Sequence, residues 1–242
     1  TNINNIELYN KYDILYSNNN NNNNEMKINN DKTLYLSGNI ISIPKNTIIV
    51  SQTYIKPDKW RIKWNKKTKK GGCITINCDT LIILPNNSLN VDGMGYHGNN
   101  NYNKGKGIKY NSVAGYGTKG LRADGGNKYG NKELTTLYHG SGCKNKKYGI
   151  GGGIIDIQCN KLFNFGSILS DGYKYGSGGS IFILAKSFIN CGSVTAKTHD
   201  YVIRGHGRIA FYCDEYIDKG YVVPTPFKGS FEDGQKIVNN RR

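Results

Sequence analysis

The sequence of 242 residues is long enough for one domain with a buried core, and 33 lysines and arginines against 17 acids give a formal net charge of +16. Its 31 glycines and 33 asparagines argue against a helical bundle, because both residues are poor helix formers, and the glycines lack the every-third-residue period of collagen. No apolar run approaches the roughly 18 residues that a membrane-spanning helix needs, so the sequence predicts no membrane span.

The first 30 residues are a low-complexity segment with an unbroken run of asparagine at residues 18–24. A polar homopolymer buries too little apolar surface to offset the chain entropy lost on folding. We therefore expect a flexible Asn-rich segment over residues 1–30, one Gly-rich domain over residues 31–224 and a C-terminal tail over residues 225–242.

Short strands are expected directly after the Asn-rich segment. Between residues 33 and 50, apolar residues alternate with polar ones at Ile41, Ile43, Ile48 and Val50. This period of two is typical of strands that bury one face.

Residues 56–70 form a dense cationic segment that also contains both tryptophans of the chain. Basic side chains neutralise phosphates and interleaved aromatic rings stack on bases, so this segment is a candidate polyanion-binding patch. Its residues are Lys56, Lys59, Trp60, Arg61, Lys63, Trp64, Lys66, Lys67, Lys69 and Lys70. We favour a solvated basic surface, or a tether to acidic glycans or an acidic partner subunit, over binding of nucleic acid.

Residues 93–153 contain 17 glycines, with tyrosine, lysine and asparagine between them. This spacing is too irregular for long strands, and we expect a long loop insertion here.

An internal repeat is the strongest signal in the chain. Four segments align without gaps: GGCITINCDTL (71–81), GGIIDIQCNKL (152–162), GGSIFILAKSF (178–188) and HGRIAFYCDEY (206–216). After the last three, the similarity continues through Gly166, Gly192 and Gly220 into a second short apolar stretch. Each unit therefore reads as a strand, a turn and a second strand.

A two-strand unit cannot bury its apolar face alone, whereas a stack of such units gives every strand a neighbour and forms a continuous core. We therefore predict an all-β fold, a parallel β-solenoid or β-helix-like stack. Alternation predicts the inward-facing residues, which are Ile74, Ile76, Cys78, Ile155, Ile157, Cys159, Ile181, Ile183, Ala185, Ile209, Phe211 and Cys213.

Several fragments, among them WNKKTKKGGCITI, GGGIIDIQC and GSGGSIFILAKSFINCGSVTAK, resemble the glycine-rich repeats of adhesin-like surface proteins of bacteria, protists and giant viruses. The resemblance covers roughly residues 40 to 216. It implies a β-solenoid on a surface and carries no defined activity. The chain departs from the repeat class at residues 198–207 and at Cys143, where further glycines would be usual.

The six cysteines contain no CxxC motif and no spacing typical of metal ligands. Three of them occupy the predicted inward column, where a small apolar side chain suits a narrow core. We expect buried free thiols, with a disulfide among Cys73, Cys143 and Cys191 as the alternative, and we predict no cofactor and no metal site.

A glycan-cleaving site would need two or three acids that converge on one groove. Asp156 is predicted on the outward face of its strand and Asp171 in the turn that follows. Asp79 and Asp214 share a repeat column just after their strands, where acids more often form turns. The histidines His139, His199 and His206 have no partner at triad-like spacing, and we predict no catalytic residues and no enzyme.

Repetition without a catalytic constellation predicts a structural or adhesive protein of a virion, spore or cell surface. The alternatives are a carbohydrate-active β-helix enzyme and a basic protein that binds or packages nucleic acid. An unpaired terminal strand invites another chain, so we expect self-association or contact with other structural subunits.

Overall fold

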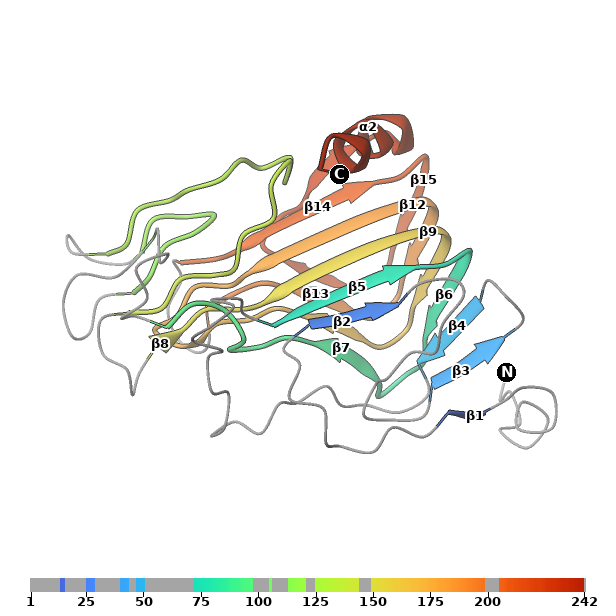
Figure 1. The fold of residues 1–242 in the computed structure, drawn as a ribbon, viewed down its shortest axis with the longest axis horizontal. Helices are drawn as coiled ribbons and strands as arrows, with labels where there is room; N and C mark the ends of the chain where they lie inside the picture. The colour runs from blue at the N-terminus through green and yellow to red at the C-terminus, as the bar shows by residue number, and fades with distance from the viewer. Residues whose placement is uncertain are drawn as a thin grey trace.

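The computed structural model describes residues 72–97, 105, 113–120, 125–143, 149–198 and 205–241, together with the backbone of four short strands nearer the N-terminus. These are β1 (Ile14–Leu15), β2 (Glu25–Ile28), β3 (Ile40–Ile43) and β4 (Thr47–Val50). Most of the regular structure in the described residues is strand, and one helix, α2 (Phe231–Arg241), follows near the C-terminus (Figure 1). The prediction of a largely β fold is confirmed.

The four repeat segments supply the strands of two parallel arrays. The first unit forms β5 (Cys73–Asn77), β6 (Thr80–Ile83) and β7 (Ser88–Asn90); the second forms β9 (Ile154–Asn164) and β10 (Ser167–Leu169); the third forms β12 (Ser180–Asn190) and β13 (Ser193–Thr195); the fourth forms β14 (Arg208–Tyr212), β15 (Glu215–Asp218) and β16 (Tyr221–Val223). The longer strands lie side by side in the large sheet, and β7, β10, β13 and β16 form a second sheet (Figure 1).

The pairing register follows the alignment of the repeats. Ile155 pairs with Ile74 on one side and with Ile181 on the other, and Ile181 pairs in turn with Ile209. In the second sheet, Ile168 of β10 pairs with its counterparts in β7 and β13. Equivalent residues of successive units are therefore neighbours, as the ungapped alignment predicts. Neither sheet closes on itself within the described ranges.

The two sheets enclose one apolar core. All the residues that alternation places inward belong to it, with Cys213 packed partly buried at its margin. The second sheet contributes Leu89, Ile168 and Val194, each fully buried. Because each unit adds the same kind of side chain at the same place, the core is continuous from one unit to the next.

Polar side chains also continue from unit to unit inside the structure. The side-chain amide of Asn164 donates a hydrogen bond of 2.8 Å to Oδ1 of Asn190, whose own amide donates one of 2.9 Å to Oδ1 of Asp218. Asn164 and Asn190 are fully buried. The row links three successive units at the corner between the two sheets, although Oδ1 of Asn164 accepts no hydrogen bond from the described residues.

The outward face of β12 and β14 is covered by a second apolar layer rather than by solvent. Phe182, Leu184, Ala210 and Tyr212 point outward and pack against α2 and against residues of the glycine-rich loop, including Tyr116 and Leu134. The ring of Tyr116 stacks on Tyr129 at 4.6 Å, and its hydroxyl lies 2.6 Å from Oγ of Ser180. Part of the tyrosine richness of the chain is therefore explained by this outer layer.

Glycine is required where backbones of the loop touch each other. A Cβ atom on Gly126 would lie 1.7 Å from the carbonyl oxygen of Gly105, and one on Gly151 would lie 1.9 Å from that of Gly140. Real Cβ atoms do not approach so closely, so these chain segments pack directly, backbone on backbone.

Additional strands extend the large sheet at both ends. β2 pairs with β5 and β4 with β6, both parallel, while β3 and β4 form an antiparallel hairpin that confirms the strands expected between residues 33 and 50. β17 (Phe227–Gly229) pairs with β14, and α2 packs on β12 and β14, so the segment expected as a C-terminal tail contains a strand and a helix. A short antiparallel pair, β8 (Gly149–Ile150) and β11 (Tyr173–Lys174), forms a separate two-stranded sheet.

In the part of the chain that the structure describes, no helix has the length and apolarity to cross a membrane.

Candidate functional site

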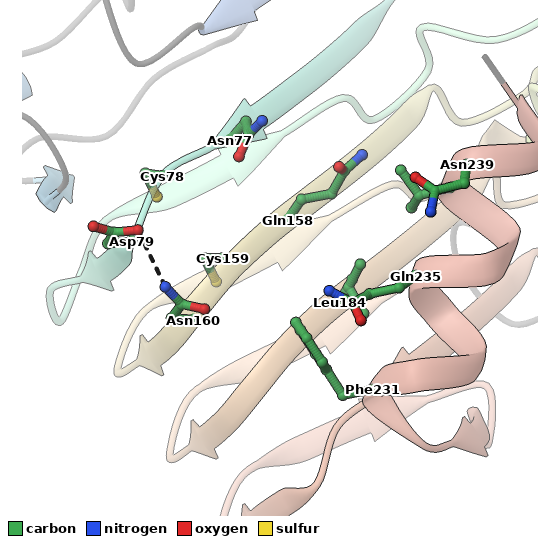
Figure 2. A pocket seen from close by; sticks show the side chains of 11 residues that line it. Asn77, Cys78, Asp79, Gln158, Cys159, Asn160, Leu184, Phe231, Gln235 and Asn239 are labelled. Atoms are coloured by element: carbon green, nitrogen blue, oxygen red, sulfur yellow. Dashed lines mark hydrogen bonds between the residues drawn. The ribbon is translucent and has the colours of Figure 1, made fainter.

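A pocket of about 260 Å³ lies between α2 and the outward face of the large sheet (Figure 2). We call it the α2 pocket. It is lined by Asn77, Cys78 and Asp79 of the first unit, Gln158, Cys159 and Asn160 of the second, Leu184 of the third, and Phe231, Gln235, Val238 and Asn239 of α2. Three successive units thus form one wall and the helix forms the other.

The sheet wall is polar because the strands turn a corner there. Cys159 and Leu162 both point into the core although they are three residues apart, so the strand bends at Asn160 and exposes that side chain. The equivalent corner of the first unit is Asp79, whose Oδ1 accepts a hydrogen bond of 3.1 Å from the amide of Asn160 (Figure 2).

The start of α2 is held by a cap and by a contact with the fourth unit. Ser230 Oγ accepts a hydrogen bond from the backbone N–H of Asp233 and donates one to its carboxylate, at 3.2 and 2.7 Å. The backbone N–H of Phe231 donates to Oδ1 of Asp214 at 3.2 Å. These bonds direct Phe231, Gln235 and Asn239 towards the sheet (Figure 2).

The end of α2 is held by Arg241. Its guanidinium lies 4.0 Å from the ring centre of Phe182 and donates hydrogen bonds to the carbonyl oxygens of Leu134 and Thr135. It also lies 3.6 Å from the carboxylate of Asp156. This one side chain therefore joins the helix, the glycine-rich loop and the sheet.

The structure revises the surroundings expected for Asp156. It does point outward, but Arg241 of α2 covers it, and the Asp156 side chain is only 13% exposed. Burial raises the pKa of Asp156, while the neighbouring Arg241 and a hydrogen bond from Gln158 act in the opposite direction. The sequence could not indicate this cover, because it comes from a helix about 80 residues away.

Five of the eleven residues that line the α2 pocket carry a carboxamide. Two of these amides already have partners: Gln158 donates to Asp156 at 3.3 Å and Asn160 donates to Asp79. The side chains of Asn77, Gln235 and Asn239 make no hydrogen bond to any described residue, and all three are exposed. The pocket thus offers donors and acceptors from both walls.

The two cysteines that line the pocket, Cys78 and Cys159, bury their thiols in the core and are poor nucleophiles. Burial, reinforced by the charge of Asp79, raises the pKa of Cys78 to about 12, and burial likewise raises the pKa of Cys159 well above its ordinary value. Only the thiolate attacks, so at neutral pH neither sulfur is activated for covalent chemistry.

The acids considered from the sequence do not meet in one groove. Asp79 lies in the α2 pocket, Asp214 at the start of α2, and Asp156 beneath Arg241. Asp171 lies beside Asp92 on the far side of the unit, where its Oδ1 accepts a hydrogen bond of 2.8 Å from the backbone N–H of Lys197. Each of the four therefore has a local structural partner.

The predicted polyanion-binding patch, Lys56 to Lys70, lies outside the described residues, as does His199. All six cysteines are among the described residues, and none of them forms a disulfide. No group of three or more histidines, cysteines and acids with the geometry of a metal site occurs in the described ranges.

The α2 pocket was not predicted from the sequence. Asn77 and Gln158 share one outward column of the repeat, and Ser230 with Asp233 has the spacing of a helix cap; these were the two signals that could have indicated it. Comparison of the chain with protein-family models, curated proteins and solved structures found no match.

Proposed function

We propose that this protein is a non-enzymatic structural or adhesive component of a virion, spore or cell surface, and that its repeats form a parallel β-solenoid. The observation that carries the proposal is the unit-to-unit register, in which Ile74, Ile155, Ile181 and Ile209 are successive neighbours across parallel strands. Such a stack forms a stiff body with a repeated surface.

The buried polar groups also support a structural role. The row from Asn164 through Asn190 to Asp218 uses polar side chains to join units rather than to bind a ligand. Asp79, Asp156, Asp171 and Asp214 likewise hold neighbouring segments in place. Acids engaged in this way stabilise the frame and are not arranged as a general acid and base.

The last unit supports contact with further subunits. β15 pairs only with β12 and β16 only with β13 among the described strands, so each has an open edge. Ile217 and Tyr221 on these strands are 49% and 55% exposed. Open edges with apolar side chains favour pairing with another chain, and we propose a second copy or another structural subunit as that partner.

The proposal is tested by locating the native protein. Antibodies against this chain should label intact particles or cells from outside, and the protein should co-purify with the particle, spore or wall fraction. Recovery only in an internal soluble or nucleoprotein fraction would contradict a surface role and would favour the nucleic-acid alternative.

A further inference from the structure

We propose that the α2 pocket binds the neutral end group of a saccharide; this names the ligand class of the adhesive function proposed above and rests on it. The pocket belongs to the outward face, where three repeat units meet a helix that is not part of the repeat. The stack alone would present the same surface at every unit. The helix makes one place on that surface different.

The hydrogen-bonding groups of the pocket match hydroxyl groups. A carboxamide presents a donor and an acceptor side by side, which is what two adjacent sugar hydroxyls require. Asn77 on the sheet wall, and Gln235 and Asn239 on the helix wall, are free of side-chain hydrogen bonds within the described part of the chain. A ligand between the walls could engage both without breaking an existing bond.

The charge of the pocket argues for a neutral ligand. The whole chain has 33 lysines and arginines, yet none is among the eleven lining residues that the structure describes. The one ionisable acid in the lining is Asp79, and Lys186 approaches from outside, 5.8 Å from the ring centre of Phe231. A phosphate or sulfate group would meet an aspartate and no lining cation, which disfavours nucleic acid and sulfated glycans here.

The apolar part of the lining suits the other face of a sugar ring. Phe231 forms an aromatic wall, and Leu184 and Val238 form an apolar floor that is almost fully buried. A sugar has C–H groups on one face and hydroxyls around its rim, so a pocket with an apolar wall and amide edges is complementary to it.

The size of the pocket limits the ligand. Its volume of about 260 Å³ is just under the roughly 300–1,000 Å³ of ordinary small-molecule pockets. One or two sugar rings fit such a space better than a long chain does. We therefore assign recognition to the end of a glycan.

The test is saturation-transfer NMR on the full chain with a panel of neutral probes: glucose, galactose, mannose, N-acetylglucosamine and their β-linked dimers. At least one probe should receive saturation, and the Asn239→Ala variant should weaken its binding at least tenfold. The matched control is Asn240→Ala, the next exposed amide of α2, which is not in the lining and should change binding less than twofold. Asn77→Ala, on the sheet wall, should repeat the loss without altering the helix.

Several outcomes would overturn the inference. They are no saturation of any neutral probe, an equal loss in Asn239→Ala and Asn240→Ala, and binding of heparin or single-stranded DNA that Asn239→Ala abolishes. Surface labelling of the native protein without saccharide binding refutes this inference alone. Saccharide binding by a protein that is found only in an internal fraction refutes the surface role instead.

Discussion

The backbone N–H of Asp171 donates a hydrogen bond of 2.5 Å to Oδ1 of Asp92, which ties together the turns of two adjacent units. Burial, followed by the charge of Asp92, raises the pKa of Asp171 to about 7, although bonds from Lys197 and Thr195 oppose the shift. A structural carboxyl of the frame is therefore half-protonated near neutrality.

This pKa predicts a pH-dependent stability. The folded chain holds the Asp171 proton more tightly than the unfolded chain does, so this contribution is complete below about pH 4 and is lost as the pH rises to about 7. Asp171→Asn should remove the loss and raise the free energy of unfolding at pH 8 by about 2–4 kcal/mol, with little effect at pH 4. Urea melts at both pH values measure it. Glu215→Gln, at an exposed position, is the control, and an equal response of both variants would contradict the prediction.

The inward column predicts that substitutions at two adjacent positions, 156 and 157, differ greatly in their effect on stability. Ile157 is fully buried between Ile76 and Ile183, so Ile157→Asp should cost several kcal/mol and prevent stable folding. Asp156→Ala leaves Arg241 without its carboxylate but with its carbonyl and ring contacts, and should cost about 1–2 kcal/mol. Thermal melts compare the two. A parent-like melt of Ile157→Asp would show that the strand faces are assigned the wrong way round.

The buried row of Asn164, Asn190 and Asp218 predicts that stability is more sensitive to substitution of Asn190 than to substitution of the adjacent Cys191. Asn190→Ala removes an acceptor from Asn164 and a donor from Asp218, which should cost about 1–3 kcal/mol because the buried Asn164 amide then keeps only its longer bond, of 3.3 Å to the carbonyl oxygen of Ser193. Cys191→Ser, one residue along and exposed, should change the free energy of unfolding by less than about 0.5 kcal/mol. Denaturant titration of both variants distinguishes these values, and similar losses would mean that the row does not stabilise the fold.

The thiols predict a graded reactivity. Cys191 is exposed and should react first with a thiol reagent at pH 8, whereas Cys78, Cys143 and Cys159 are buried and should react only after unfolding. Burial also raises the pKa of Cys213 to about 12, which places it with the slow group. Cys191→Ser should remove the fast phase of the reaction with Ellman's reagent. A fast phase that persists in this variant would place a second thiol at the surface.

The open edge of the last unit predicts association. The parent chain should show a rise in mean mass with concentration in light scattering, and Ile217→Lys should reduce it because a charge then occupies the exposed edge strand. Thr225→Lys, an exposed substitution outside the edge strands, is the control. A parent that stays monomeric over a wide concentration range would count against self-association.

The apolar core between the two sheets could be predicted from the sequence. The outer layer, formed by α2 and the glycine-rich loop, could not. Each inward isoleucine recurs at the same place in an ungapped repeat, so Ile155, Ile181 and Ile209 define the register without any structure. The outer layer has no such recurrence. The sequence of α2 contains a glycine, two asparagines and β-branched residues, all weak helix formers, and the helix is stabilised instead by its cap and by packing on Tyr212 and Leu184.

The α2 pocket was missed for the same reason. Its walls come from residues about 45 to 160 positions apart in the chain, and only the packing of α2 brings Asn239 opposite Asn77 and Gln158. In contrast, the sequence did place Asp156 on the outward face, because the alternation of a strand requires no knowledge of its cover.

The in-register pairing also has a consequence for how such a chain can change its length. In the buried polar row, Asn164 of the second unit and Asn190 of the third are 26 residues apart, and Asp218 of the fourth unit follows 28 residues later. The second and third units pair in register with each other and with their neighbours, so duplication or deletion of one of them should alter the large sheet by one strand spacing, about 4.8 Å. The length of such a protein can thus change by whole units during evolution. Helix α2, which packs on β12 and β14 of the last two units, would remain at the C-terminal end.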